Sequence, residues 1–570
     1  MTINQKYALW LKNAAEDPDL IAELNSIEGE EKKLEERFKL DLEFGTAGLR
    51  GEIGAGTFRM NIYTIRRATQ GLADYIIKKS GAKPSIAIAY DSRIKSDLFA
   101  QEAARVMAAN GIKAYIFPEL QPTPVLSFAV RHLKTDSGIV VTASHNPSEY
   151  NGYKVYGSDG CQMTDDAADA VLANINATDI FTGVKVISFE EGLASGLIEW
   201  IDDSVLTAYL EAVKACSVNP DAAKSSSLKV IFTPLHGTGN KPVRRVLAEI
   251  GLENVTVVPE QELPDGNFPT APYPNPEKPQ PFELALELAK TVKPDLIVAT
   301  DPDADRMGIA VAEKDGYKLL SGNEVGCLLL NYILESRKAN GTLPANPVAV
   351  TTIVSTPLAT AIGKKHGVDV ITVLTGFKYI GEQILLLEQK GEENRFILGF
   401  EESYGYLGGT YARDKDAVIA SMLICEMAAF YKKNSKSLLD VLEGIYKDYG
   451  IYYNKVEELV FKGLDGMEQM KSIMEKLRQN PPSELGGFKV TSYSDYLTHE
   501  RLNTASGVKE TINLPKSNVL EYQLSDNNKV IVRPSGTEPK IKIYLTANAE
   551  TLELAQGIAA GLKGSVDDLV

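Results

Sequence analysis

Hydrophobic residues recur along the chain with two periods, one typical of amphipathic helices and one typical of short buried strands. Charges interleaved with apolar residues predict helices over the first forty residues. From there to about residue 433 helical and strand patterns alternate, which predicts mostly parallel sheets covered by helices. The predicted helices are 67–80, 98–110, 203–216 and 242–250, and the predicted strands are 85–90, 113–117, 137–141, 229–232, 294–300, 348–353, 368–374 and 395–399.

The pattern changes beyond residue 446. Two apolar strands, 530–532 and 541–545, flank a polar loop, and a helix at 551–563 closes the chain. This arrangement predicts a smaller α+β unit after three α/β units. A length of 570 residues agrees with roughly four domains. We expect the units at 1–205, 206–322, 323–445 and 446–570.

The composition limits the kinds of molecule that the protein could bind and the cellular compartment that it fits. The formal net charge of −16 and the pI near 5.1 disfavour nucleic acid and anionic membranes as partners. No apolar stretch is long enough to span a bilayer, and the charged first forty residues are neither a signal nor a transit peptide. The four cysteines lie far apart without a CxxC pair, which favours a reducing cytoplasm. An anionic substrate would therefore need arginines and lysines placed locally.

Ser144 lies in Thr142-Ala143-Ser144-His145-Asn146-Pro147, where the strand 137–141 gives way to a loop. Active groups on open α/β sheets gather at the carboxyl ends of strands. Two interpretations remain open for the motif alone, a reactive hydroxyl or a turn serine that bonds its own backbone. A serine-hydrolase triad is not predicted, because G-x-S-x-G is absent and His145 should point away from Ser144.

The second motif, DPDADR at 301–306, follows a predicted strand. Three alternating carboxylates could surround one hard divalent cation, and without it they would raise one another's pKa. A calcium loop of the EF-hand type is excluded, because Arg306 and Ala312 occupy its Gly and Glu positions. A phosphatase with an Asp-x-Asp pair leaves the third carboxylate unexplained, and the remaining alternative is a solvated acidic turn.

Three further loops carry groups suited to a phosphorylated polyol. Glu401 and Ser403, in GFEESYG, could bind neighbouring sugar hydroxyls. The loop RPSGTEPK at 533–540 joins an arginine, two hydroxyls and a glycine into a candidate phosphate cradle. The glycine-rich segment ending at Arg50 is either a tight turn or a close approach to an anion. For GTGN at 237–240 a structural turn is favoured.

Together these motifs resemble the four signature loops of the α-D-phosphohexomutases, in the same order and over nearly the whole chain. The segments FGTAGLRG at 44–51, TGFKYIG at 375–381 and ARDKDA at 412–417 are similar to the phosphoglucomutase/phosphopentomutase branch. The resemblance implies an α/β fold with three related mixed α/β domains and a smaller C-terminal α+β domain around a central cleft. The metal loop departs from the commoner DGDGDR, with Pro302 and Ala304 in place of glycines, but it keeps all three carboxylates.

The resemblance also implies roles for single residues. Ser144 would carry a phosphoryl group, and its phosphate would join Asp301, Asp303 and Asp305 as ligands of Mg²⁺. Lys154 would be the general acid/base, and His145 belongs to the expected catalytic set. The expected substrate contacts are Glu401 and Ser403 for the sugar, Arg533, Ser535, Gly536 and Thr537 for the distal phosphate, Arg50 and Arg306 beside the phosphoserine, and Lys378 and Lys415 near the substrate.

The resemblance and the residues together predict a Mg²⁺-dependent mutase that interconverts glucose 1-phosphate and glucose 6-phosphate through a sugar 1,6-bisphosphate. As a base, Lys154 would need a lowered pKa. The alternatives are a pentose-phosphate mutase, a metal-dependent sugar-phosphate phosphatase, and a phosphosugar-binding regulatory protein. We expect a small-molecule substrate, no nucleic acid, no membrane, a cytoplasmic location, and a monomer, with a dimer as the alternative.

Overall fold

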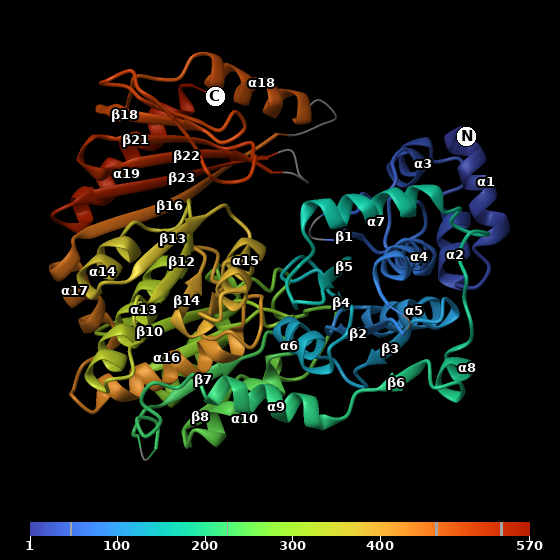
Figure 1. Ribbon diagram of the computed structural model, residues 1–570, viewed down its shortest axis with the longest axis horizontal. Helices are drawn as coiled ribbons and strands as arrows, with labels where there is room; N and C mark the ends of the chain where they lie inside the picture. The colour runs from blue at the N-terminus through green and yellow to red at the C-terminus, as the bar shows by residue number, and fades with distance from the viewer. Residues whose placement is uncertain (46–47, 82, 225, 462–465, 536–539, 570) are drawn as a thin grey trace.

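The computed structural model describes residues 1–569 except 46–47, 82, 225, 462–465 and 536–539 (Figure 1). The described residues form three sheets covered by helices and a fourth, C-terminal sheet. The expected fold class is therefore confirmed. Among these residues no helix combines the length and the apolar character that crossing a membrane requires.

Three short helices open the chain, as the charged and apolar pattern predicts. Thr2 caps the first helix through a reciprocal bond with Gln5, and Asp17 caps the second, which begins with a proline. The rings of Trp10 and Phe38 pack edge to face, with centroids 6.0 Å apart. The helices are α1 (Ile3–Asn13), α2 (Pro18–Ser26) and α3 (Glu31–Phe38).

The first sheet has the order β1-β5-β4-β2-β3-β6. Strand β2 runs parallel to β3 and β4, and β6 runs parallel to β3. The sheet is therefore mostly parallel, as predicted, and β5, which pairs with β4 and β1, is its antiparallel strand. The reason is the short loop that carries Ser144 directly from β4 into β5, since so short a connection returns the chain antiparallel. The elements are β1 (Leu49–Glu52), α4 (Ile62–Lys79), β2 (Ser85–Tyr90), α5 (Ser96–Ala109), β3 (Lys113–Ile116), α6 (Thr123–Leu133), β4 (Ser137–Val141), β5 (Tyr150–Gly157), α7 (Asp165–Ala177), α8 (Phe189–Ala194) and β6 (Ile198–Trp200).

The second sheet has the order β11-β10-β9-β7-β8 and repeats the same design. Parallel strands β7, β8 and β9 are followed by an antiparallel β10, and the acidic motif forms the loop between β9 and β10. The elements are α9 (Asp203–Lys214), β7 (Val230–Thr233), α10 (Asn240–Glu249), β8 (Val255–Val257), α11 (Pro259–Glu262), η1 (Gln280–Phe282), α12 (Glu283–Val292), β9 (Leu296–Thr300), β10 (Met307–Glu313) and β11 (Gly316–Leu320).

The third sheet, β13-β12-β14-β15, again adds an antiparallel strand after a motif loop, here the one holding Glu401. Helix α16 lies in the largest core cluster, which joins all three α/β units. The elements are α13 (Gly322–Ala339), β12 (Val348–Thr352), α14 (Leu358–His366), β13 (Asp369–Val373), α15 (Phe377–Glu388), η2 (Glu393–Arg395), β14 (Phe396–Phe400), β15 (Tyr406–Leu407), α16 (Ala417–Lys432) and α17 (Leu438–Tyr449).

The C-terminal unit is an antiparallel sheet with helices α18 and α19, and in Figure 1 it lies beside β12, β13 and α15. A hydrophobic cluster that includes Ile353, Leu374, Ile531 and Tyr544 joins it to the third unit. The elements are β16 (Ile451–Val460), α18 (Gly466–Gln479), β17 (Glu484–Leu485), β18 (Phe488–Asp495), β19 (Glu500–Asn503), β20 (Lys509–Thr511), β21 (Leu520–Leu524), η3 (Ser525–Asn527), β22 (Lys529–Pro534), β23 (Lys540–Ala549) and α19 (Leu552–Asp567).

Candidate active site

Ser144 lies three residues beyond β4 and is buried, with its side chain aimed at the acidic loop of the second unit. Its Oγ donates a hydrogen bond to Oδ2 of Asp301 at 2.9 Å. The backbone of Ser144 is left-handed, with φ of 52°, and its N–H is held by Oγ1 of Thr142 at 2.8 Å. A non-glycine residue in this conformation is strained, and such strain clusters at functional sites.

Arg93, at the carboxyl end of β2, fastens the serine loop and was missed by sequence reasoning. Its guanidinium donates to four backbone carbonyl groups of that loop, those of Ser144 at 2.5 Å, Pro147 at 2.8 Å, Tyr150 at 3.0 Å and also Asn146. The side chain is fully buried. The sequence did carry a signal for it. Arg93 follows the predicted strand 85–90, just as Ser144 follows the predicted strand 137–141, and strands of one parallel sheet end at the same edge.

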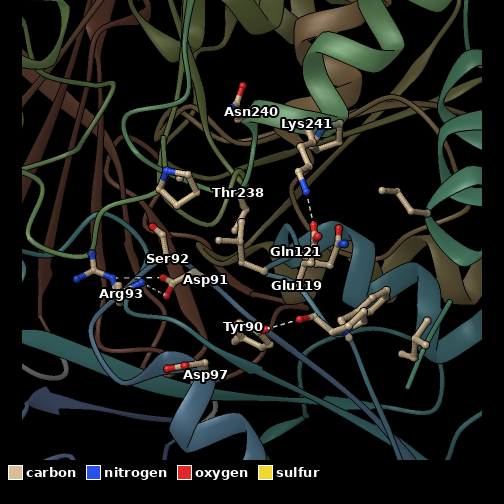
Figure 2. Close-up of a pocket in the computed structure, with 18 of the residues that line it drawn as sticks. Tyr90, Asp91, Ser92, Arg93, Asp97, Glu119, Gln121, Thr238, Asn240 and Lys241 are labelled. Atoms are coloured by element: carbon tan, nitrogen blue, oxygen red, sulfur yellow. Dashed lines mark hydrogen bonds and ion pairs between the residues drawn. The ribbon is translucent and has the colours of Figure 1, made fainter. Parts of the chain in front are cut away.

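A cavity of about 1010 Å³ lies on the other side of Asp91 and Arg93, between the first and second units. Figure 2 shows these two residues on one side of the cavity, and Lys241 of the second unit pointing towards Glu119 of the first. None of Ser144, the three aspartates or Glu401 lines it. The candidate catalytic groups therefore gather outside this cavity, and Arg93 both lines it and contacts the loop of Ser144.

His145 does not point away from Ser144, which corrects the sequence-based expectation. Its Nδ1 lies 3.2 Å from the Oγ of Ser144. The expectation assumed the alternation of an extended strand, and the left-handed turn at Ser144 breaks that alternation. Burial, and then the charges of Arg306 and Arg50, hold the pKa of His145 well below its usual value, so the imidazole is neutral at pH 7.

Asp301, Asp303 and Asp305 converge on one point in the loop between β9 and β10. All three are buried, and one carboxylate oxygen from each lies within 4.8 Å of the others. Oδ1 of Asp303 and Oδ1 of Asp305 receive no hydrogen bond from the described residues. Buried carboxylate oxygens without donors suit a hard divalent cation, so the residues fit Mg²⁺. Burial, and then the neighbouring aspartates, raise the pKa of Asp301.

The two replaced glycines of this loop have visible consequences. Ala304 adopts a left-handed backbone with φ of 49°, a conformation that costs alanine more than glycine. A Cβ on Gly237 would lie 2.5 Å from Cα of Pro302, and Thr238 donates its N–H to the Pro302 carbonyl at 2.8 Å. The segment GTGN thus supports the metal loop through close backbone packing, in agreement with the favoured structural interpretation.

Two lysines approach the acidic group. Nζ of Lys154, on β5, lies 2.8 Å from Asp303 and 3.4 Å from Asp305, and Nζ of Lys415 lies 3.1 Å from Asp305. Burial lowers the pKa of Lys154, but the two carboxylates outweigh it and the pKa is raised. The lowered pKa expected for a base is therefore not what these surroundings produce. A cation on the same carboxylates would compete with this stabilisation of the ammonium group.

Arg50 lies at the serine loop, where its Nη1 donates to Oδ1 of Asn146 at 3.3 Å. The glycine near it serves a close backbone approach, because a Cβ on Gly48 would meet the Tyr153 carbonyl oxygen at 1.8 Å. The close approach at this segment is thus to the backbone of β5, and the approach of Arg50 to an anion stays a prediction. The glycine packs on β5, and the arginine faces the loop of Ser144.

The loop that holds Glu401 and Ser403, here called the sugar-type loop, contacts the loop of the three aspartates. Arg306 and Gly405 form a β-bridge, and Met307 donates its N–H to the Tyr404 carbonyl at 3.1 Å. Oε1 of Glu401 accepts the N–H of Gly376 at 2.8 Å, and the carboxylate is buried. Ser403 is half-buried on the same loop. Burial is also the leading reason that the pKa of Glu401 is raised.

The remaining expected contacts lie farther from this group. Lys378 pairs with Asp165 of the first unit at 2.7 Å rather than with the aspartate cluster. Nη1 of Arg533, at the end of β22, donates to the Tyr544 hydroxyl at 3.4 Å, and Ser535 donates its N–H to the Lys540 carbonyl at 2.8 Å. Gly536 and Thr537 lie outside the described residues.

Comparison with known protein families supplies a match for each unit. The profiles described as phosphoglucomutase/phosphomannomutase alpha/beta/alpha domains I, II and III match residues 41–180, 207–316 and 321–449, and the profile of the C-terminal domain matches residues 498–560. The order is the one in which the four motif loops occur. The matched segments together cover well over half of the chain.

Two curated relatives extend over almost the whole chain. A phosphoglucomutase of Staphylococcus haemolyticus (strain JCSC1435) is 38% identical over 520 residues, which are 91% of this chain and 92% of the relative. A phosphoglucomutase of Staphylococcus saprophyticus is 35% identical over 547 residues, which are 96% of this chain and 97% of the relative.

Solved structures agree in fold. A putative phosphomannomutase from Thermus thermophilus superposes with a TM-score of 0.69 at 23% identity, covering 93% of this chain and 99% of the other. Parafusin, a phosphoglucomutase from Paramecium, gives a TM-score of 0.67 at 16% identity, covering 93% and 94%. With the four domain matches and the curated relatives, these findings establish that the chain belongs to the phosphoglucomutase/phosphomannomutase family.

Proposed function

We propose that this protein is a phosphoglucomutase, which interconverts glucose 1-phosphate and glucose 6-phosphate through glucose 1,6-bisphosphate. The observation that carries the proposal is the contact of Ser144 Oγ with Asp301, inside a buried group of three carboxylates. The names of the curated relatives support the same activity. Asp301, Asp303, Asp305 and the phosphorylated Ser144 would hold Mg²⁺, which would supply positive charge beside the transferring phosphoryl group.

In the proposed reaction the phosphoryl group leaves Ser144 for a free hydroxyl of the sugar monophosphate. The bond between phosphorus and the Ser144 oxygen breaks, and a bond between phosphorus and the sugar oxygen forms. Lys154, placed 2.8 Å from Asp303, would take the sugar proton in its neutral form, which a cation on Asp303 and Asp305 would favour over the ammonium form. The proton removed from the sugar would be returned to the Ser144 oxygen, so that the transfer leaves no net change in protons. Arg50 and Arg306 would neutralise charge on the phosphoryl oxygens.

The bisphosphate would then turn and return its other phosphoryl group to Ser144. Glu401 and Ser403 would bind the sugar hydroxyls, and Arg533 with Ser535 would bind the distal phosphate, as Gly536 and Thr537 would on the same loop. Lys378 and Lys415 would lie near the substrate. Exclusion of water protects the phosphoserine from hydrolysis, and the buried setting of Ser144 suits that need.

The test compares kcat/KM for glucose 1-phosphate and ribose 1-phosphate, with Mg²⁺ and the matching bisphosphate, and measures release of inorganic phosphate. Preference for the hexose with little phosphate release supports the proposal. Preference for the pentose would identify a pentose-phosphate mutase, and stoichiometric phosphate release would identify a phosphatase. No turnover and no phosphoserine by mass spectrometry would favour a regulatory binding protein.

We further propose a cytoplasmic monomer, with a dimer as the alternative and with neither nucleic acid nor membrane as partner. The support is the acidic net charge of −16 and the four cysteines, all of which are free. Light scattering of the purified protein measures the oligomeric state. A measured mass of twice 62.1 kDa would show that the protein is a dimer.

A further inference from the structure

The segment between α11 and α12 lies against the catalytic loops. Its content of Pro, Asn, Asp and Gly predicts an irregular surface loop, and the irregular backbone is observed, but its inner side is buried. The ring of Phe268 lies 4.9 Å from the guanidinium of Arg93, which holds the serine loop. The ring of Tyr273 packs edge to face on His145 at 5.8 Å. The segment is thus fastened to the loop of Ser144.

Glu277 in this segment is held in a fixed backbone position. Oδ1 of the buried Asn275 accepts the N–H of Glu277 at 3.0 Å, and the Asn275 carbonyl accepts the N–H of Lys278 at 3.0 Å. Such a turn, with Pro274 and Pro276 on either side of Asn275, leaves the backbone little freedom. The position of the Glu277 carboxylate is therefore organised in advance by its own loop.

The carboxylate of Glu277 pairs with Nη1 of Arg306, next to the metal loop. The buried Nε of Arg306 donates no hydrogen bond within the described part of the chain and lies 3.8 Å from Asp305. Both side chains are mostly buried, with 18% of Arg306 and 25% of Glu277 exposed. Burial lowers the pKa of Arg306, but Glu277 leads the charges that outweigh burial and raise it.

The negative charge of Glu277 also reaches the sugar-type loop. After burial, it is the leading charge that raises the pKa of Tyr404, and it contributes to the raised pKa of Glu402. Glu277 is therefore paired with Arg306 and close enough to the loop of Glu401 and Ser403 for its charge to be felt there. An anionic group that approaches Arg306 from this side meets a guanidinium already shared with a carboxylate.

We propose that Glu277 is a positioning residue that weakens the grip of Arg306 on a sugar phosphate. The inference rests on the proposed mutase function. A guanidinium that faces only a phosphate binds it with two parallel, charge-assisted bonds. The bisphosphate of a mutase must be released from one orientation and bound in the other, so a grip that is too strong slows turnover. The Glu277 carboxylate competes for the same guanidinium and keeps the intermediate mobile.

The first experiment measures binding without turnover. In a Ser144→Ala background, calorimetry with glucose 6-phosphate and with inorganic phosphate compares Glu277 with Glu277→Gln. We expect both anions to bind roughly 3-fold to 20-fold tighter in Glu277→Gln, because one nearby negative charge is removed. Glu262→Gln is the matched control, since Glu262 pairs with Arg244 at the solvent-exposed end of α11, and it should change neither affinity.

The second experiment measures turnover with Ser144 present. Glu277→Gln should lower both KM and kcat, whereas Glu277→Asp, which keeps the charge, should stay close to the parent enzyme. In an Arg306→Ala background the effect of Glu277→Gln on binding should disappear. Unchanged or weaker binding in Glu277→Gln, or an effect that persists without Arg306, would overturn the inference. If the parent enzyme shows no mutase turnover, the proposed function fails, while tighter binding of inorganic phosphate would still support the role of Glu277 at Arg306.

Discussion

The hydroxyl of Ser144 donates a hydrogen bond of 2.9 Å to the Asp301 carboxylate, which lies 157 residues further along the chain, in a loop of the second sheet. Each residue lies in a loop that leads from a strand of the parallel part of its sheet into an antiparallel neighbour, from β4 into β5 and from β9 into β10. In the proposed function, the same design would supply the phosphoryl carrier from one unit and the cation ligands from the next.

Ser144→Ala should lower mutase kcat by at least about a thousandfold, because the proposed reaction needs the Ser144 hydroxyl to carry the phosphoryl group. The free energy of unfolding should fall by no more than about 3 kcal/mol, because a single hydrogen bond to the Asp301 carboxylate is lost. Turnover assays and phosphoserine mass spectrometry check the result. Retained turnover would contradict the assignment of Ser144.

Asp303→Asn should shift the Mg²⁺ concentration needed for half-maximal activity upward by about tenfold or more, because one of three charged ligands becomes neutral. The measurement is a metal titration of mutase activity. Asp315→Asn, at the exposed turn between β10 and β11, is the control and should leave the titration unchanged. Identical midpoints for the two variants would show that the acidic triplet does not bind the metal.

Arg93→Lys should lower kcat by about tenfold to a hundredfold and lower the free energy of unfolding by about 2–4 kcal/mol. A lysine cannot donate to all four carbonyl groups that Arg93 holds, so buried acceptors lose their partners. Urea unfolding and steady-state kinetics check both effects. Arg395→Lys, which alters an arginine in η2, serves as the control. If Arg395→Lys lowered kcat and the free energy of unfolding as much as Arg93→Lys does, Arg93 would have no special role.

Arg533→Ala should raise KM for the sugar monophosphate by about tenfold to a hundredfold, because a charge-assisted bond to the phosphate is lost. The free energy of unfolding should fall by less than about 1 kcal/mol, since the side chain is half-buried and its bond to Tyr544 is long at 3.4 Å. Kinetics and thermal unfolding are measured together. A KM equal to that of the parent enzyme would exclude Arg533 from the binding site.

The stability of the protein should depend on Glu402 between about pH 4.5 and pH 7. Burial, and then the charge of Glu401, raise the pKa of Glu402 to about 7. In that window the folded state binds a proton that the unfolded state has lost, so the free energy of unfolding falls as pH rises. Between pH 5 and pH 7.5 the free energy of unfolding, measured with urea, should fall by about 1–3 kcal/mol less in Glu402→Gln than in the parent protein. The same pH dependence in both proteins would contradict the raised pKa.

Local pattern determined most of the elements and the identity of the loops. Strands 85–90 and 137–141 are observed at the predicted bounds. A short apolar run between turn residues is best buried as a single strand of the sheet, so its ends are fixed by the residues on either side. The side chains Asp301, Asp303 and Asp305 alternate along a single short loop, so their convergence followed from short-range spacing. In the same way the residues of the four motifs, with their order, indicated the family that the domain matches establish.

Tertiary structure alone decided the contacts between loops that are distant in sequence. The left-handed turn at Ser144 brought His145 towards the hydroxyl, although strand alternation predicts the opposite. The carboxylates around Lys154 raised a pKa that a base would need lowered, and their distance from its ammonium group depends on how two sheets pack. The energies of hydrogen bonds and of charge pairs change steeply over a few ångströms. The pattern of residues along the chain does not give distances of that size between side chains of separate units.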